Sequence, residues 1–269
     1  MNYEEQKTGE FALNEKISNA ILIFLLLVRL ADEYLAVWIF GANTPDWFGQ
    51  WYAGIAYILT ATIVWLNRHR LAALNIDRPF IAVLILGGVL YSFYLRHGAG
   101  IFVGITAGLI FWAYQTNQFV FNNPVPYPKA TRLLILLTIP LALAPVLLFR
   151  LTLKTPLDFD TFFTTLIEIL IIDLAPIVFE EVLFRGALWA YVRSLGLSEQ
   201  IAFYTQAILF WISHHSLLLL PNPYSFWVPL PIEAILLGLM TWRSKSLTPS
   251  TISHFLFNFI TRLLLIMSS

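Results

Sequence analysis

The stretch Val178-Phe-Glu-Glu-Val-Leu-Phe-Arg-Gly186 puts three ionisable side chains into an otherwise apolar run. On a helix, Glu181 and Arg185 are four residues apart and share a face, whereas Glu180 points roughly 100° away from Glu181. A charged side chain at membrane depth costs about 3 kcal/mol or more unless it is paired or faces water. The stretch therefore predicts a buried helix whose charged groups have a task, and other parts of the chain must supply their partners.

The composition of the whole chain indicates a polytopic membrane protein. The 269 residues are 58% apolar and only 12% charged, and the mean hydropathy is +0.74. A soluble domain has about twice that charged fraction. Backbone groups in lipid must be satisfied internally, so the fold class is predicted to be an all-α transmembrane helix bundle. The first residues lack the basic region of a signal peptide, and no cleaved segment is expected.

Charge and cysteine content exclude several functions. The 16 basic and 16 acidic side chains cancel, which argues against nucleic acid as a partner. The absence of cysteine excludes disulfides, thiol catalysis, iron–sulfur clusters and cysteine-based zinc sites.

Apolar runs of about 20 residues predict the membrane spans. The candidates are 17–40, 52–67, 79–95, 99–116, 131–151, 162–194, 199–220, 227–243 and 248–267. The run 162–194 is too long for one upright helix, and Pro176 is expected to kink it. With the N-terminus in the cytoplasm, ten Lys and Arg residues fall in cytoplasmic segments and three on the opposite side. This bias favours nine spans with the N-terminus inside, and a count of eight stays open.

The segment 117–130, rich in Asn and Pro, is the clearest linker. It divides the chain into an N-terminal region, 1–130, with four spans and no assigned function, and a C-terminal region, 131–269. The fourth span carries Gly100, Gly104 and Gly108 at a spacing of four, which is typical of close helix packing. Packing within the chain is preferred over a dimer face, although both readings stay open.

Three polar clusters lie in the C-terminal spans. The first contains the paired glutamates, the second is Leu209-Phe-Trp-Ile-Ser-His-His215, and the third is Ser253-His-Phe-Leu-Phe-Asn258. Phe210 and His214 are one helical turn apart, and so are His254 and Asn258. A helix bundle can therefore direct a carboxylate, two imidazoles and a carboxamide into one cavity.

This set of side chains suits hydrolysis. A buried glutamate can take a proton from water, and a histidine–asparagine pair can stabilise an oxyanion. Alternatively, Glu180, His214 and His254 match a zinc ligand set with an open fourth position, so the cofactor is either none or a divalent metal. The helical H-E-x-x-H pattern of common zinc proteases is absent.

Each feature also has a purely structural reading. The Glu181–Arg185 pair could be a structural bridge or could act in the chemistry, and His215 is expected to be structural. The other charged groups inside spans are expected to pair with one another or to face a wet cavity. They are Arg29, Asp32, Glu33, Glu168, Asp173, Glu233 and Arg262. Of these, Glu233 could line the substrate entrance.

With the clusters in view, the chain resembles the CPBP family of intramembrane proteases, which contains CAAX proteases, bacteriocin-processing proteins and bacterial "abortive infection" proteins. The family's marks are E-E-x-x-x-R, F-x-x-x-H and H-x-x-x-N/D on separate helices. They read here as Glu180-Glu181-x-x-x-Arg185, Phe210-x-x-x-His214 and His254-x-x-x-Asn258. The resemblance covers about 162–262 and leaves the first four spans outside it.

The resemblance implies a role for each of these residues. Glu180 would be the general base, with His214 as its partner in polarising the attacking water. His254 and Asn258 would stabilise the oxyanion. Arg185 would hold Glu181 and fix the helix. The resemblance leaves metal dependence open, and the absence of a further carboxylate near His254 favours a metal-free mechanism.

One expectation conflicts with the predicted topology. His214 falls near the outer end of its span and His254 near the inner end of its own, so a tilted or late-starting helix at 199–220 is needed to bring them level.

Together, these observations predict an intramembrane endopeptidase of the bacterial cytoplasmic membrane. It would act in contact with the lipid bilayer on a membrane-associated or lipid-modified protein or peptide. The alternatives are a non-catalytic scaffold or immunity-type protein of the same fold, and a transporter with Glu168, Asp173 and Glu233 as a proton path.

Overall fold

The computed structural model describes residues 3–40, 45–95, 98–121, 129–148, 158–219 and 224–268, and over these ranges it is helical and contains no strand. The α-helices are α1 (Tyr3–Phe40), α2 (Asp46–Leu66), α3 (Arg78–Tyr94), α4 (Ala99–Gln115), α5 (Lys129–Leu148), α6 (Phe159–Ile172), α7 (Leu174–Glu180), α8 (Trp189–Ser194), α9 (Glu199–Ile212), α10 (Tyr224–Trp227), α11 (Pro229–Ser244) and α12 (Thr248–Ser268). Two short 3-10 helices, η1 (Leu71–Leu74) and η3 (His215–Leu219), and one π-helix, η2 (Glu181–Leu188), lie between these α-helices.

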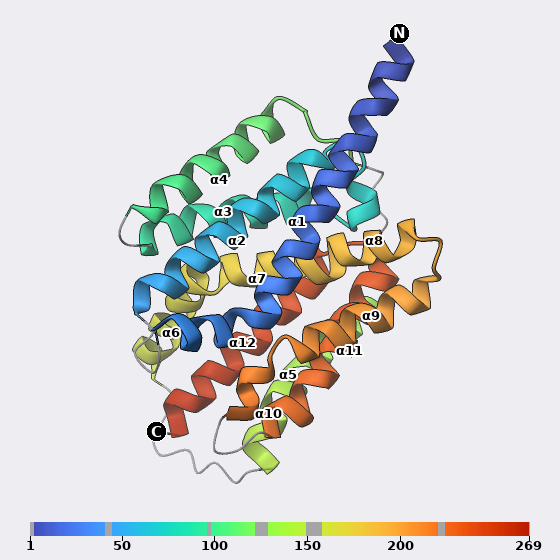
Figure 1. Cartoon of the computed structure of the whole chain (residues 1–269). Helices are drawn as coiled ribbons and strands as arrows, with labels where there is room; N and C mark the ends of the chain where they lie inside the picture. The colour runs from blue at the N-terminus through green and yellow to red at the C-terminus, as the bar shows by residue number, and fades with distance from the viewer. Residues whose placement is uncertain are drawn as a thin grey trace.

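The helices form a bundle around one continuous rod made of α7, η2 and α8 (Figure 1). Helices α2 and α3 pack on α7, α9 packs on η2 and α8, and α1 crosses η2. The rod is buried along almost its whole length, from Leu174 to Trp189. Its apolar side chains join those of α2, α3 and α9 in a single core cluster that includes Tyr57, Phe80 and Phe210. The stretch that carries the paired glutamates therefore lies at the centre of the molecule.

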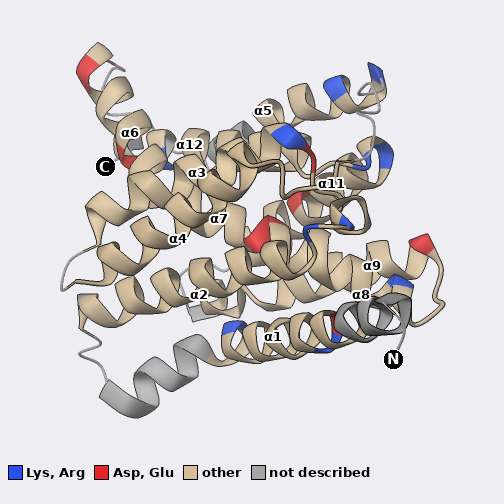
Figure 2. Ribbon diagram, turned by 90° about the horizontal axis from the view of Figure 1, so that it is seen from above, with Lys and Arg blue, Asp and Glu red and all other residues tan. Residues whose placement is uncertain are grey.

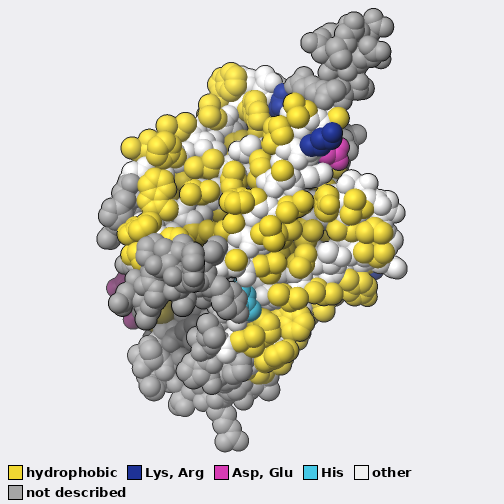
Figure 3. Space-filling view, viewed as in Figure 1, with side chains coloured by type: hydrophobic (Ala, Val, Ile, Leu, Met, Phe, Trp, Pro, Cys, Tyr) yellow, Lys and Arg dark blue, Asp and Glu magenta, His cyan; other side chains and the backbone are white. Residues whose placement is uncertain are grey.

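The outer surface of the bundle is apolar. Charged positions are few along the helices, and some of them lie near the middle of the bundle (Figure 2). Apolar side chains cover much of the described face in Figure 3, and the outward side chains of α3 and α4 include Phe93, Ile101 and Leu109, each more than half exposed. This is the surface expected of a protein that faces lipid rather than water.

The structure confirms the all-helical class, while the number of spans stays a prediction. Each of the nine candidate segments is helical over most of its described residues. Among the described residues, Tyr224–Ser244 is long and apolar enough to cross a membrane, and the pair Phe159–Ile172 and Leu174–Ser194 qualifies only when counted together. Helices α3 and α4 are apolar but shorter than that criterion.

The predicted kink in 162–194 is a break of the helix three residues before Pro176. Helix α6 ends at Ile172, α7 begins at Leu174, and the two axes differ by 49°. Proline has no N–H to donate to the carbonyl of Ile172, four residues earlier, and it is tolerated in the first turn of a helix. The new helix therefore starts just before the proline, with Asp173 at the joint.

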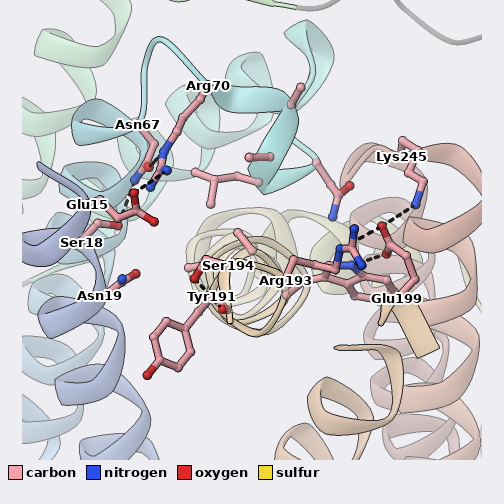
Figure 4. Close-up of a pocket in the computed structure, with 17 residues that line it drawn as sticks. Glu15, Ser18, Asn19, Asn67, Arg70, Tyr191, Arg193, Ser194, Glu199 and Lys245 are labelled. Carbon is pink, nitrogen blue, oxygen red and sulfur yellow. Dashed lines mark hydrogen bonds and ion pairs between the residues drawn. The ribbon is translucent and has the colours of Figure 1, made fainter. Parts of the chain in front are cut away.

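Several segments predicted to be cytoplasmic meet at one end of the bundle. They line a cavity of about 380 Å³ around the end of α8 (Figure 4). On one side of α8, Arg70 pairs with Glu15, and on the other side Arg193 and Lys245 pair with Glu199. The start of α1, the α2–α3 connection, the α8–α9 turn and the α11–α12 turn therefore share one side, as the distribution of basic residues predicted.

The glycine spacing of α4 serves packing within the chain at one of its three positions. A Cβ atom on Gly100 would overlap the backbone carbonyl oxygen of Ser92 in α3, whereas Gly108 has no atom within 4 Å of that position. Gly104 would make only ordinary contacts with the Ser92 side chain. The structure thus supports the preferred reading for Gly100.

Gly100→Ala is expected to lower the free energy of unfolding by about 1–3 kcal/mol, because the added methyl group must push α3 and α4 apart. Gly108→Ala is the matched control and should be neutral or slightly stabilising, since alanine is the better helix former. Thermal unfolding of both variants in the same detergent measures the difference. Equal midpoints for the two variants would contradict the close approach at Gly100.

Two predictions from the sequence fall wholly or partly outside the described residues. Of the linker 117–130, residues 122–128 lie outside the described residues; before them, the backbone N–H of Val120 donates to the carbonyl of Arg68 at 2.8 Å, and after them α5 begins at Lys129. The side chains of Asp32 and Glu33 also lie outside the described residues. The division of the chain at 130/131 stays a prediction.

Candidate active site

Glu180 is the last residue of α7 and lies where three other elements meet. Its side chain is 11% exposed. The oxygen Oε1 is 2.8 Å from Nη2 of Arg29 in α1 and 3.8 Å from Nε2 of His214. The other oxygen, Oε2, is 3.7 Å from Nε2 of His254 in α12. The carboxylate therefore stands between two imidazoles and a guanidinium drawn from three separate parts of the chain.

Glu181 is fully buried and holds a second set of partners. Its Oε1 is 3.2 Å from Nη1 of Arg185, which is also fully buried, and 2.9 Å from Nδ1 of His254. The two adjacent glutamates thus contact opposite nitrogens of the same imidazole ring. Glu181 fixes the orientation of His254 and thereby directs Nε2 of His254 towards Glu180.

The residues Glu181–Leu188 form a π-helix and not the α-helix that the sequence predicted. In a π-helix the backbone hydrogen bonds join residues five apart, and such turns occur frequently at functional sites. Despite the wider turn, the Glu181–Arg185 ion pair still forms. All eight residues of η2 are buried, so the surrounding helices hold this less stable turn in place.

Phe210 of α9 packs against most of the charged cluster. The centroid of its ring is 4.6 Å from that of His214 and 5.8 Å from that of His254. The guanidinium carbon of Arg185 lies 3.9 Å from the ring centroid, a distance suited to a cation–π contact. Phe210 is fully buried, so its ring shields these charged groups on one side.

His214 follows the end of α9 and has a defined tautomer. Its Nδ1 is 2.8 Å from the carbonyl oxygen of Phe210, which only accepts hydrogen bonds, so Nδ1 carries a proton. Its Nε2 is 3.3 Å from Nη2 of Arg29, which only donates, so Nε2 is the acceptor. The imidazole is therefore neutral, and its Nε2 lone pair accepts from Arg29 at a distance of 3.8 Å from Oε1 of Glu180.

The expected mismatch in height between the two histidines does not occur. Helix α9 ends at Ile212, and the turn that follows places His214 beside Glu180. His254 lies in the second turn of α12. Hydrogen bonds to residues next to η1 hold the start of α12 in place. The backbone N–H of Leu247 donates to the carbonyl of Asn75 at 2.7 Å, and the Asn75 side chain donates to the carbonyl of Arg185 at 3.1 Å.

The structure brings together five of the six predicted site residues: Glu180, Glu181, Arg185, His214 and His254. Asn258 lies one turn after His254, is half-buried, and is not part of the hydrogen-bonded cluster formed by the described residues. Nδ1 of His215 lies 3.3 Å from the carbonyl oxygen of Ile212, and a structural role for His215 stays a prediction.

Arg29 and Glu233 lie at the site but were not predicted to act in it. From the sequence they were expected to pair with other charged groups or to face a wet cavity, and Glu233 could also have lined the substrate entrance. Arg29 contacts both Glu180 and His214, although it is about 150 positions from the first and nearly 190 from the second. Glu233 of α11 is buried and interacts electrostatically with His254 and Arg185, and its Oε1 has no hydrogen-bond partner among the described residues. The only signal for either residue was a charge inside an apolar run.

The zinc hypothesis receives no support from the arrangement of the donors. Among the described residues, no group of three or more His, Asp or Glu side chains is set to hold a metal ion. The space between Glu180 and His214 is bridged by the Arg29 guanidinium, which would repel a cation. Glu180, His214 and His254 do not fit a metal site as they stand.

Comparison with known proteins supports the resemblance seen in the motifs. Residues 162–260 match the model of a family described as "Rce1-like: Type II CAAX prenyl endopeptidase Rce1-like". The matched region begins in α6 and ends in α12, so it includes the paired glutamates and both histidines but leaves α1 and Arg29 outside. Searches of curated proteins and of solved structures found no match.

Proposed function

We propose that the chain is an intramembrane endopeptidase, because residues 162–260 match the model of the type II CAAX prenyl endopeptidase Rce1-like family. Its substrate is a membrane-associated or lipid-modified protein or peptide. One observation carries the proposal: two buried glutamates and two histidines from different helices converge inside an apolar bundle. So many ionisable groups at membrane depth are costly, which is typical of a site that uses them.

In the proposed mechanism, Glu180 is the general base. A water molecule beside Glu180 gives one proton to the carboxylate while its oxygen attacks the carbonyl carbon of the substrate. The neutral His214 accepts a hydrogen bond from the same water through Nε2, in place of its longer 3.3 Å contact with Arg29, and holds the water in line. When the tetrahedral intermediate collapses, Glu180 returns the proton to the leaving nitrogen and the C–N bond breaks.

His254 is the proposed electrostatic partner of the carbonyl oxygen. Its Nδ1 lies against Glu181 at 2.9 Å and its Nε2 faces Glu180 at 3.7 Å, so carboxylates on both sides favour the doubly protonated ring. An imidazolium can donate from Nε2 to the oxyanion of the intermediate while Nδ1 stays bound to Glu181. Asn258, one turn away, is the proposed second donor to the oxyanion.

Catalysis by glutamate without a metal is part of the proposal, because the guanidinium of Arg29 occupies the neighbourhood in which a cation would have to bind. Incubation with a strong divalent-metal chelator should therefore leave the cleavage rate unchanged, within about twofold. The measurement is the initial rate of peptide cleavage before and after removal of the chelator by gel filtration. Loss of activity that returns on addition of Zn²⁺ would contradict a metal-free mechanism.

The function itself is tested with the purified chain in lipid nanodiscs. The substrates are fluorogenic peptides presented at the membrane, each made with and without a prenyl group near its C-terminus. We expect cleavage of at least one membrane-bound peptide and little cleavage of a soluble peptide of the same sequence. A folded protein that cleaves no member of the set would favour the non-catalytic scaffold.

A further inference from the structure

The first helix of the chain lies against the candidate active site. Arg29 of α1 is largely buried, with 18% of its side chain exposed, and its Nη2 lies 2.8 Å from Oε1 of Glu180. The same nitrogen is 3.3 Å from Nε2 of His214. Helix α1 crosses η2, so this contact belongs to the packing of the bundle and does not depend on a long reach of one side chain.

Arg29 supplies Glu180 with a permanent positive charge at hydrogen-bond distance, in addition to the His254 ring, whose Nε2 lies 3.7 Å from Oε2 of Glu180. The arginine of the motif, Arg185, is engaged by Glu181 at 3.2 Å. A carboxylate this buried can stay ionised only beside a cation or strong donors, and an uncharged carboxylic acid cannot take a proton from water. Because Arg is always protonated, the contact with Arg29 keeps Glu180 in the form that a general base needs.

Arg29 also acts on His214. The Nδ1 of that ring is committed to the carbonyl of Phe210, so the protonation of Nε2 decides the charge of the ring. A guanidinium beside Nε2 disfavours a proton there, since it would bring two positive groups together. The same arginine therefore favours an ionised Glu180 and a neutral His214, which is the pair of states that can accept the two hydrogens of one water molecule.

We propose that Arg29 is a positioning residue of the active site, through which the N-terminal helix sets the charge states of Glu180 and His214. The inference rests on the proposed function. Helix α1, which lies outside the family match, would then have a role at the active site. Residues 162–260 would not form a complete site without α1.

The test compares Arg29→Met with Arg29→Lys in the full chain, with Arg70→Met as the matched control. Arg70 also forms an ion pair with α1, at 3.0 Å to Glu15, but it lines the cavity at the end of α8 and not the site. We expect Arg29→Met to lower kcat/KM by about 100-fold at neutral pH, and Arg29→Lys to recover at least about a tenth of the wild-type value. Arg70→Met should keep the wild-type rate.

The pH profile separates a charge effect from a structural effect. Without the Arg29 guanidinium, Glu180 should hold its proton to higher pH. The acidic limb of the kcat/KM profile of Arg29→Met should therefore move to higher pH, and part of the activity should return in alkaline buffer. Arg29→Lys should keep the wild-type limb. Wild-type kcat/KM in Arg29→Met, or an equal loss at every pH in both variants, would overturn the inference while the protease remained. If the wild type cleaved no substrate, the proposed function would fall first and this inference with it.

Discussion

Glu180→Gln is expected to lower kcat/KM by about 1000-fold while the protein remains folded. Glutamine has nearly the same size and can still accept a hydrogen bond from Arg29, but its amide cannot take a proton from water. Among the described residues, the carboxylate of Glu180 is the acidic group that lies within 4 Å of both His214 and His254, at 3.8 and 3.7 Å. The measurement is the rate of cleavage of one membrane-bound peptide by wild type and variant in the same nanodiscs.

The control for this prediction is Glu15→Gln, which makes the same chemical change at a glutamate of α1 that pairs with Arg70. It should cleave at the wild-type rate. Both variants should unfold at temperatures close to that of the wild type, because Arg29 and Arg70 keep 18% and 46% of their side chains exposed to solvent, unlike the fully buried Arg185. Wild-type kcat/KM in Glu180→Gln would remove Glu180 from its role as general base and would favour a structural reading of the paired glutamates.

The helices could be predicted from the sequence because hydropathy alone decides which segments leave water. All nine apolar runs are helical over most of their described residues, and the break near Pro176 follows from the missing N–H of proline. The number of spans is harder to predict, since it depends on how far each helix tilts and how much of it is buried by others. Helices α3 and α4 are apolar but short, and length and hydropathy do not decide how they sit in a bilayer.

The site could be predicted in part because its motifs are local. The spacing of four places Phe210 beside His214 and Arg185 beside Glu181, and both contacts form. The contact between Arg29 and Glu180 could not be predicted, because nothing in local spacing relates residues so far apart in the chain. The π-helix η2 could not be predicted either, because the packing of the surrounding helices, and not local spacing, holds its wider turn.

The second large effect is expected at the Glu181–Arg185 pair, where both side chains are fully buried. Arg185→Met should lower the free energy of unfolding by about 3–5 kcal/mol, because it leaves the Glu181 carboxylate buried without its nearest permanent cation. Glu181→Gln should cost a similar amount, since the Arg185 guanidinium would keep only the ring of Phe210 at 3.9 Å as a partner for its charge. Chemical denaturation of each variant in mixed micelles gives these values.

The double variant Glu181→Gln with Arg185→Met should be more stable than either single variant, because neutral groups of similar size replace both charges at once. It should nevertheless remain inactive, since His254 would lose the carboxylate that lies 2.9 Å from Nδ1 and favours its charged form. Restored stability with lost cleavage would mean that the pair serves both as a structural bridge and in the chemistry, the two readings that the sequence left open. A double variant that cleaves as fast as the wild type would make the pair purely structural, and one no more stable than the single variants would mean that the protein needs the ion pair itself.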